Sequence, residues 1–358
     1  MPSLDQTMQR VLALAREAGT PAAAAARDLV AAHLEALGYQ VQRQRFAFAP
    51  SSLNGFPVFG AGLGGLALLL FPLLTGDRAP RWAAGLVLAG GLVLLAVLAV
   101  GIGLGWLPLG GTREDANLIA TRGGAPVRRW IVAHLDTKAQ IQSMAGRLVA
   151  VWVIGMAVAA LAALALARLG GVVAVPFAGV GAAGAVLAGA LAGRGRLRGT
   201  TPGARDNGTG VAAALAAAEG LDDPATGILI TGAEEFGLVG ARVFVAQRAT
   251  ELREAVVVNL DTIDEEGELA VVSHDARGAA LARREAPRLA ASGLSPRLRR
   301  LPIGILTDSL PFARAGVPAL TIGRLTWRTL RTIHTPRDTA AGLSLETAMR
   351  VGRALAAN

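Results

Sequence analysis

Cysteine, aromatic residues and charged residues are absent or scarce in this chain of 358 residues, and each shortage excludes a class of protein. Without cysteine there are no disulfide bonds and no thiolate metal ligands. Aromatic residues make up only 4% of the chain, and basic pairs such as Arg299-Arg300 have no aromatic residues interleaved. Because single-stranded nucleic acids stack their bases on aromatic rings, we expect no nucleic-acid partner despite the net charge of +9.

The shortage of charge is concentrated in long continuous runs. Charged residues reach 17%, against roughly 25% in soluble proteins. No ionisable residue occurs in four runs, 46–76, 82–112, 148–167 and 169–193. A membrane-spanning helix needs about 20 apolar residues. The runs therefore predict four transmembrane helices, near Phe56–Thr75, Ala83–Leu107, Leu148–Ala167 and Val172–Ala192. The alternative, buried helices of a soluble core, would show a polar face at helical period, and these runs show none.

The four spans form two hairpins, residues 56–107 and 148–193, of an integral, multi-pass membrane protein. Met1 to Arg16 has the pattern of a polar amphipathic helix and lacks the apolar centre of a signal peptide. Ten basic residues flank the spans on the side that holds both termini: Arg43, Arg45, Arg113, Arg122, Lys138, Arg147, Arg194, Arg196, Arg198 and Arg205. The other side has Arg78, Arg81 and Arg168. The positive-inside tendency then predicts that the polar part of the chain faces the cytoplasm.

Removing the hairpins leaves residues 1–55, 108–147 and 194–358, a usual length for one discontinuous α/β domain. Strand-like and helix-like segments alternate along it. Residues 129–133, 227–231, 255–260 and 318–322 are short apolar runs typical of strands, and residues 211–219, 238–248, 278–291 and 343–357 have helical patterns. This alternation predicts a mixed, mostly parallel sheet between two layers of helices.

Five short segments of this domain carry metal-ligating side chains beside small residues: His134-Leu-Asp136, Asp206-Asn-Gly208, Glu234-Glu235, Asp261 and His334. His134, Glu234, Glu235 and Asp261 follow predicted strands. Functional groups in such sheets collect at the carboxyl ends of the strands, so we expect these side chains to converge. Taken alone, Glu234-Glu235 would be a solvated acidic pair and Asp206 a helix cap.

The motifs resemble those of metallopeptidase family 28, the co-catalytic zinc aminopeptidases related to bacterial leucyl aminopeptidase and aminopeptidase Y. They are Ala133-His-Leu-Asp136, Gly203-Ala-Arg-Asp-Asn-Gly-Thr-Gly210, Gly232-Ala-Glu-Glu-Phe-Gly-Leu-Val-Gly240, Asn259-Leu-Asp261 and Ile333-His-Thr-Pro-Arg-Asp338. The resemblance covers the whole polar domain, and the number and order of the motifs make it specific. The resemblance implies a three-layer αβα zinc-exopeptidase domain of the phosphorylase/hydrolase-like type.

The resemblance also implies two zinc ions bridged by Asp206. His134 and Asp261 would complete one position, and Glu235 and His334 the other. Imidazole and carboxylate ligands suit zinc, although cobalt or manganese can substitute. Two such metals share a water, lower its pKa and stabilise the oxyanion that forms, so the implied reaction is peptide hydrolysis by a metal-bridged hydroxide.

Two further residues receive roles near these metals. Glu234 is expected to act as general base, since adjacent side chains at a strand end diverge. Asp136 is expected to accept the free N–H of His134 and fix its tautomer. His33 and His274 fit no motif and are not expected to be ligands. Asp308 and Asp338 are expected to support the site structurally. Ser309 stands where many relatives have histidine, Thr209 replaces a common serine and Arg205 precedes Asp206; none of these departures removes a ligand, and they lie in loops that shape the substrate pocket.

The leading hypothesis is therefore a membrane-anchored di-zinc aminopeptidase acting on peptides. The alternatives are an inactive receptor or scaffold with the peptidase fold, and a glutaminyl-cyclase-like transferase with one zinc. Short connectors join His134 and Asp206 to the second hairpin, and an extended residue spans about 3.5 Å, which places the metals within roughly 45 Å of the bilayer. Peptides held at the membrane surface are accordingly included among the expected substrates.

Overall fold

The computed structural model describes residues 3–124, 126–301 and 305–357, which divide into two compact units. Unit 1 comprises Met1–Phe48, Thr112–Ala139 and Gly199–Asn358. Unit 2 comprises Ala49–Gly111 and Gln140–Arg198. Each unit is therefore assembled from segments that are distant in sequence.

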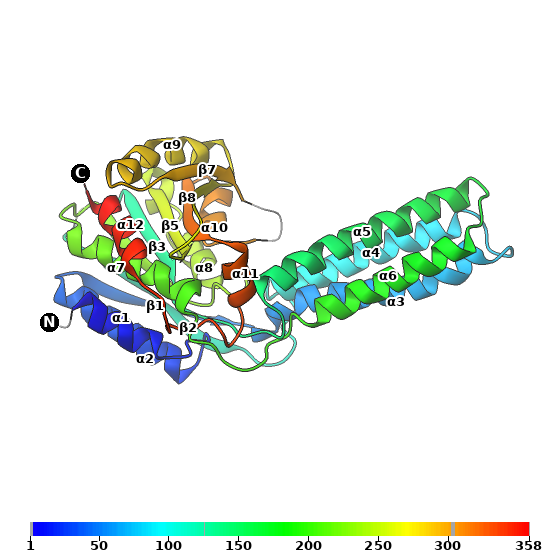
Figure 1. Cartoon of the computed structure of the whole chain (residues 1–358), viewed down its shortest axis with the longest axis horizontal. Helices are drawn as coiled ribbons and strands as arrows, with labels where there is room; N and C mark the ends of the chain where they lie inside the picture. Colours follow the sequence, from blue (N-terminus) through cyan, green and yellow to red (C-terminus); the bar gives the residue numbers. More distant parts are fainter. Residues whose placement is uncertain (1–2, 125, 302–304, 358) are drawn as a thin grey trace. The chain divides into compact units, whose positions relative to one another are not determined.

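Unit 1 is built on an eight-stranded sheet in the order β1-β2-β4-β3-β5-β8-β6-β7 (Figure 1). The strands are β1 (Gln40–Phe48), β2 (Arg113–Thr121), β3 (Arg129–His134), β4 (Thr226–Thr231), β5 (Val256–Ile263), β6 (Glu268–Ser273), β7 (Pro296–Arg300) and β8 (Ala319–Leu325). The pairs β3–β4, β3–β5, β5–β8 and β6–β7 are parallel, and the pairs β1–β2, β2–β4 and β6–β8 are antiparallel. The prediction of a mixed, mostly parallel sheet is confirmed.

Helices cover both faces of this sheet. The helices of unit 1 are α1 (Leu4–Leu12), α2 (Pro21–Ala36), α7 (Thr209–Gly220), α8 (Val239–Gln247), α9 (Ala276–Ala291), α10 (Ser309–Arg314), α11 (Trp327–Thr332) and α12 (Glu346–Ala356). Successive side chains of a strand point to opposite faces, so Ile131 of β3 belongs to the core cluster that includes residues of α1, α2, α7, α9 and α12, whereas Trp130 belongs to the cluster that includes residues of α8 and α10. The continuous apolar runs of the central strands follow from this burial on two sides.

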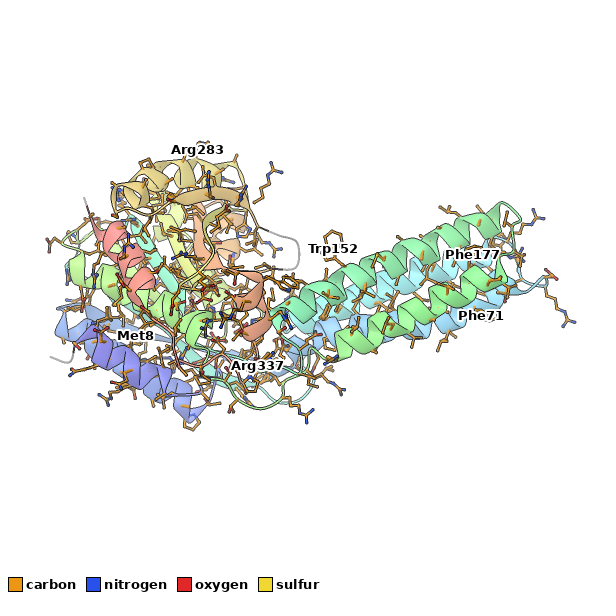
Figure 2. All side chains as sticks on the ribbon, viewed as in Figure 1. Met8, Phe71, Trp152, Phe177, Arg283 and Arg337 are labelled. Carbon is orange, nitrogen blue, oxygen red and sulfur yellow. The ribbon has the colours of Figure 1, made fainter. Side chains whose placement is uncertain are left out.

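Unit 2 consists mainly of four long helices, α3 (Gly55–Thr75), α4 (Ala83–Gly103), α5 (Met144–Leu169) and α6 (Val175–Gly193) (Figure 1). All four are long and apolar enough to cross a membrane. Large apolar side chains of these helices are exposed; Trp152 and Phe177 are 68% and 70% exposed, and Trp152 projects outward in Figure 2. The four predicted spans thus coincide with helices, with ends that differ by a few residues from the predicted ones.

Small residues let α3 and α6 approach closely within unit 2. A Cβ atom added to Gly60 would lie 2.3 Å from the Cβ of Ala192, and one added to Gly189 would lie 2.7 Å from the carbonyl oxygen of Gly60. Glycine is therefore required at both positions by packing, as is common between membrane helices. At the opposite end of the bundle, Arg168 donates hydrogen bonds to the carbonyls of Leu73, Gly76 and Ala79.

Candidate metal centre

The candidate ligands of unit 1 meet at the carboxyl-terminal edge of its parallel strands. His134 is the last residue of β3, Glu234 and Glu235 follow β4, and Asp261 lies in the irregular end of β5. Asp206 lies in the segment Ala204–Gly208 before α7, where its backbone is not helical (φ −116°, ψ 94°), and His334 follows α11. The strand ends meet here because β3, β4 and β5 are parallel neighbours.

These side chains form two groups whose nitrogen and oxygen atoms lie within 4.8 Å of one another. His134, Glu234 and Asp261 form the first group, and Asp206, Glu235 and His334 form the second. In the first, Nε2 of His134 lies 3.9 Å from Oδ1 of Asp261 and 4.0 Å from Oε2 of Glu234. In the second, Nε2 of His334 lies 3.4 Å from Oε1 of Glu235.

Asp206 links the two groups with its two carboxylate oxygens. Oδ1 lies 3.3 Å from Nε2 of His134, and Oδ2 lies 2.9 Å from Nε2 of His334. One carboxylate that faces two imidazoles through different oxygens has the arrangement of a bridging ligand. Because Asp206 Oδ1 is closer to His134 than Glu234 is, Asp206 is the better third ligand for the first position.

A buried carboxylate holds the backbone of the bridging residue. Oδ1 of Asp338 accepts a hydrogen bond from the backbone N–H of Arg205 at 2.9 Å, and Oδ2 accepts one from that of Asp206 at 3.1 Å. On the other side, Asn207 donates to the carbonyl of Leu260 and accepts from the backbone N–H of Thr262. The Asp206–Asn207 peptide bond is cis. The neighbours of Asp206 therefore connect its loop to the end of β5.

The carboxylate of Asp136 likewise holds the backbone of Glu234 and Glu235. Its Oδ1 accepts from the backbone N–H of Glu234 at 2.9 Å and its Oδ2 from that of Glu235 at 3.1 Å. The imidazole Nδ1 of His134 lies 3.1 Å from the backbone oxygen of Asp136 and 3.7 Å from its carboxylate. The carbonyl of Asp136 thus contacts the imidazole more closely than the expected carboxylate, which is occupied by the two backbone N–H groups.

Left-handed backbone conformations occur beside several ligands. His334 itself has φ of 63°, Ala233 before Glu234 has 51°, and Thr262 after Asp261 has 53°. Non-glycine residues in this region are strained and persist only where the surrounding structure fixes them, often at functional sites. The strain here accompanies the convergence of the ligand side chains.

The cluster of candidate ligands is buried and strongly acidic. His134 is 1% exposed, and Asp206, Glu235 and His334 are 6–7% exposed. Burial by itself lowers the pKa of His134, but Glu234 and the hydrogen-bonding carboxylates around it raise that pKa well above its usual value. Burial raises the pKa of Glu234 as well, and the nearby Glu235, Asp308 and Asp261 add to the rise. Such a cluster of carboxylates favours a cation at its centre.

Asp308, Asp338 and Ser309 are buried polar residues. Asp308 is fully buried and binds the hydroxyl of Thr231, and burial raises its pKa to about 7. Burial likewise raises the pKa of Asp338 to about 6. Ser309 is buried, and its hydroxyl lies 2.9 Å from Nε2 of His274. His33 lies in the core against Thr7, 3.1 Å from its hydroxyl.

Two buried cations beside the site, Arg16 and Lys138, were not among the predicted site residues. The guanidinium of Arg16 donates to the carbonyls of Leu135, Pro202 and Gly203, so it joins the loop after His134 to the loop before Asp206. Lys138 is 5% exposed and its ammonium contacts Oε2 of Glu235. Besides the nearby carbonyl of Val11, the guanidinium of Arg16 has three partners that are 119 and more residues away, which no local pattern reveals. For Lys138 a signal exists, because it is the only lysine among the chain's 35 basic residues.

The donor set fits divalent zinc. Two imidazole nitrogens and several carboxylate oxygens are the ligands zinc takes from proteins without thiolates. Oε1 of Glu235 is buried without a hydrogen-bond partner, as expected for an atom that binds a cation. His134, Glu234 and Asp261 could hold one ion and Asp206, Glu235 and His334 a second, and Asp206 also faces His134 of the first group.

Comparison with known proteins agrees with this geometry. Residues 191–358 match the model of peptidase family M28. A glutaminyl cyclase from Fimbriiglobus ruber has a similar structure, with a TM-score of 0.58 at 16% identity, over 99% of this chain and 93% of that chain. An aminopeptidase from Aneurinibacillus sp. strain AM-1 gives 0.58 at 17%, over 98% and 92%. A zinc aminopeptidase from Bacillus subtilis gives 0.58 at 15%, over 99% and 94%. No curated protein matches the chain by sequence. At these identities the solved structures establish a shared fold.

Proposed function

Because this chain belongs to peptidase family M28, we propose that it is a membrane-anchored zinc aminopeptidase, which removes residues from the amino terminus of peptides. The observation that carries the proposal is the position of Asp206, whose two oxygens face His134 and His334 at 3.3 Å and 2.9 Å. This arrangement supports two metal positions that share one carboxylate. Zinc bound there would lower the pKa of a water molecule and stabilise the oxyanion of the hydrolysis.

Glu234 is the residue we assign to proton transfer. Its carboxylate belongs to the first group, 4.0 Å from Nε2 of His134, and its backbone is fixed by Asp136. The structure also admits Glu234 among the ligands of the first position, but the shorter distance from Asp206 to His134 leaves Glu234 free to accept a proton. The raised pKa of Glu234 suits a group that takes a proton from water and returns it to the leaving amine near neutral pH.

The four apolar helices of unit 2 support anchoring in a bilayer. The helices are long and apolar enough to cross a membrane, and large apolar side chains on them are exposed, such as Val97 at 62% and Leu166 at 70%. On the basis of these helices and of the distribution of basic residues, we propose that unit 1 lies on the cytoplasmic side. We propose also that its substrates include peptides at the membrane surface. Replacing Val97 by aspartate would cost roughly 2.5–3.5 kcal/mol in lipid and release part of the protein from membranes on alkaline extraction, unlike Leu298→Asp in unit 1.

A peptide-release assay tests the activity. The purified chain, loaded with zinc, is expected to release amino-terminal residues from an unblocked peptide library and to leave amino-terminally acetylated copies intact. Glu234→Ala should abolish release without loss of bound zinc, whereas the exposed Glu266→Ala should retain the full rate. Zinc-loaded protein that releases no residue from any peptide would show the proposal to be wrong. Less than one zinc per chain would favour the inactive scaffold instead.

Glutaminyl cyclisation is the second candidate, because the Fimbriiglobus ruber enzyme matches this fold as well as the aminopeptidases do. In that reaction the α-amine of an amino-terminal glutamine attacks its own side-chain amide, a lactam ring closes and ammonia leaves. A peptide beginning with glutamine separates the two functions. An aminopeptidase releases free glutamine, whereas a cyclase releases ammonia and leaves the peptide at its original length.

A further inference from the structure

Lys138 stands out among the cations of this chain. It is the only lysine, and its ammonium is buried against Oε2 of Glu235, a side chain that is itself 4% exposed. A buried charge is costly unless it is paired, so this contact holds both side chains in place. Lys138 therefore lies directly behind a proposed ligand of the second metal position.

The contact divides the two oxygens of Glu235 between two roles. Oε2 is taken by Lys138, whereas Oε1 lies 3.4 Å from Nε2 of His334 and has no hydrogen-bond partner. Only Oε1 is left to bind a cation. Glu235 is thus presented as a ligand with one oxygen.

The choice of lysine over arginine agrees with this division. Arginine binds both oxygens of a carboxylate through its planar fork, whereas an ammonium is a compact charge that can bind one oxygen. Every other basic residue of this chain is arginine. A guanidinium at position 138 would compete for Oε1 as well as Oε2, so the lone lysine is the cation that leaves Oε1 available.

The charge of Lys138 also distinguishes the two metal positions. A cation on Oε1 of Glu235 would share that carboxylate with a positive charge already present. Asp261 and Glu234, in the first group, face the imidazole of His134, which is neutral when it binds a metal. Like charges in a buried site repel strongly because there is little water to screen them.

We propose that Lys138 is a positioning residue that restricts Glu235 to one ligand oxygen and makes the Asp206–Glu235–His334 position the weaker of the two metal positions. The first ion then binds at His134, Asp206 and Asp261, and the second binds only at higher metal concentration. This inference rests on the proposed metal centre and adds an order of filling to it.

Zinc titration of three full-length proteins tests the proposal. After removal of metal by a chelator, the wild type is expected to bind two zinc ions with distinct affinities. Lys138→Met removes the charge with little change in shape and should tighten the second event by about tenfold or more, because the repulsion between two like charges in a buried site is removed. Lys138→Arg should weaken or abolish the second event, because the guanidinium occupies both oxygens. The first event should be similar in all three proteins.

The single lysine provides a second measurement that needs no variant. Protein labelled with 13C only at the lysine Cε carbon gives one side-chain NMR signal. The first equivalent of zinc should leave that signal nearly in place, and the second should shift it. A shift with the first equivalent would overturn the proposed order of filling.

Other outcomes separate the inference from the function on which it rests. Two equal affinities in the wild type, or loss of the second ion in Lys138→Met, would refute the role of Lys138 and leave the metal centre standing. A wild type that binds no zinc would refute both.

Discussion

Replacement of Arg16 by methionine is expected to weaken both the fold of unit 1 and its metal centre. Arg16 is completely buried, and its guanidinium binds the carbonyls of Leu135 at 2.8 Å and Gly203 at 3.0 Å, as well as that of Pro202. Leu135 follows His134 and Gly203 precedes Asp206 by three residues. The side chain therefore connects the loops that carry two proposed ligands.

The expected loss of stability follows from the groups left without partners. Each buried carbonyl that loses its donor costs about 1–3 kcal/mol, so three carbonyls cost about 3–9 kcal/mol. Removing the buried charge recovers several kcal/mol of desolvation, an effect that also lowers the pKa of Arg16 to about 10. A net loss of about 3 kcal/mol remains, which corresponds to a fall of about 6–12 °C in melting temperature for a unit of this size.

Thermal unfolding and zinc titration of the variant measure the two effects separately. Zinc affinity should fall about 10- to 100-fold, because the loops bearing His134 and Asp206 lose their link. Arg122→Met is the matched control, since Arg122 binds the carbonyls of Leu37 and Leu221 and stacks on Tyr39, away from the site. It should lower the melting temperature without changing zinc affinity. An Arg16→Met protein with unaltered melting temperature and zinc affinity would contradict this reasoning.

Three further outcomes are expected. Asp136→Asn loses one of the two acceptors that hold the backbone of Glu234 and Glu235, so peptide hydrolysis should fall about 10- to 100-fold; an unchanged rate would argue against that positioning role. Burial lowers the pKa of His33, so the unfolded chain takes up a proton before the folded protein does as the pH falls below about 6.5. The melting temperature of the wild type should therefore exceed that of His33→Gln fully at pH 7.5 and by less at pH 5.5. A difference that grows on acidification would contradict this pH dependence. Gly60→Ala should destabilise unit 2 in detergent, whereas Gly65→Ala, whose Cβ would meet nothing within 4 Å, should not; equal melting temperatures would show that the close approach of α3 and α6 is dispensable.

The elements that the sequence reveals best are those whose environment is uniform along their length. The strand β3 is apolar from Trp130 to Ala133 because both of its faces are buried, and the pattern predicts it to within one residue. The four helices of unit 2 are apolar throughout. The strand β7 was not predicted. Four of its five residues are exposed, and among the described residues it pairs with β6 alone, at the sheet edge, so it lacks both the alternation and the apolar run that mark a strand.

The candidate site shows the same division between local and distant causes. His134 and Asp261 could be placed together because each ends an apolar strand, and parallel neighbouring strands end at one edge. The exact acceptors could not be foreseen. The carboxylate of Asp136 binds the backbone N–H groups of Glu234 and Glu235, which lie 98 and 99 positions further along the chain. This pairing depends on the loop after β4 and not on the spacing of Asp136 from His134.

The two apolar insertions begin and end at residues of unit 1 that lie next to one another. The first departs after Phe48 and returns at Thr112, and Phe48 of β1 is paired with Arg113 of β2 in the sheet. The second departs after Ala139 and returns at Gly199, and the hydroxyl of Thr137 donates a hydrogen bond to the carbonyl of Thr201. Each excursion thus begins and ends at residues that already contact one another, as in tolerated domain insertions. The second insertion lies between His134 and Asp206, so the contact of Thr137 with Thr201, together with Arg16, keeps these two ligands in register across a long interruption of the chain.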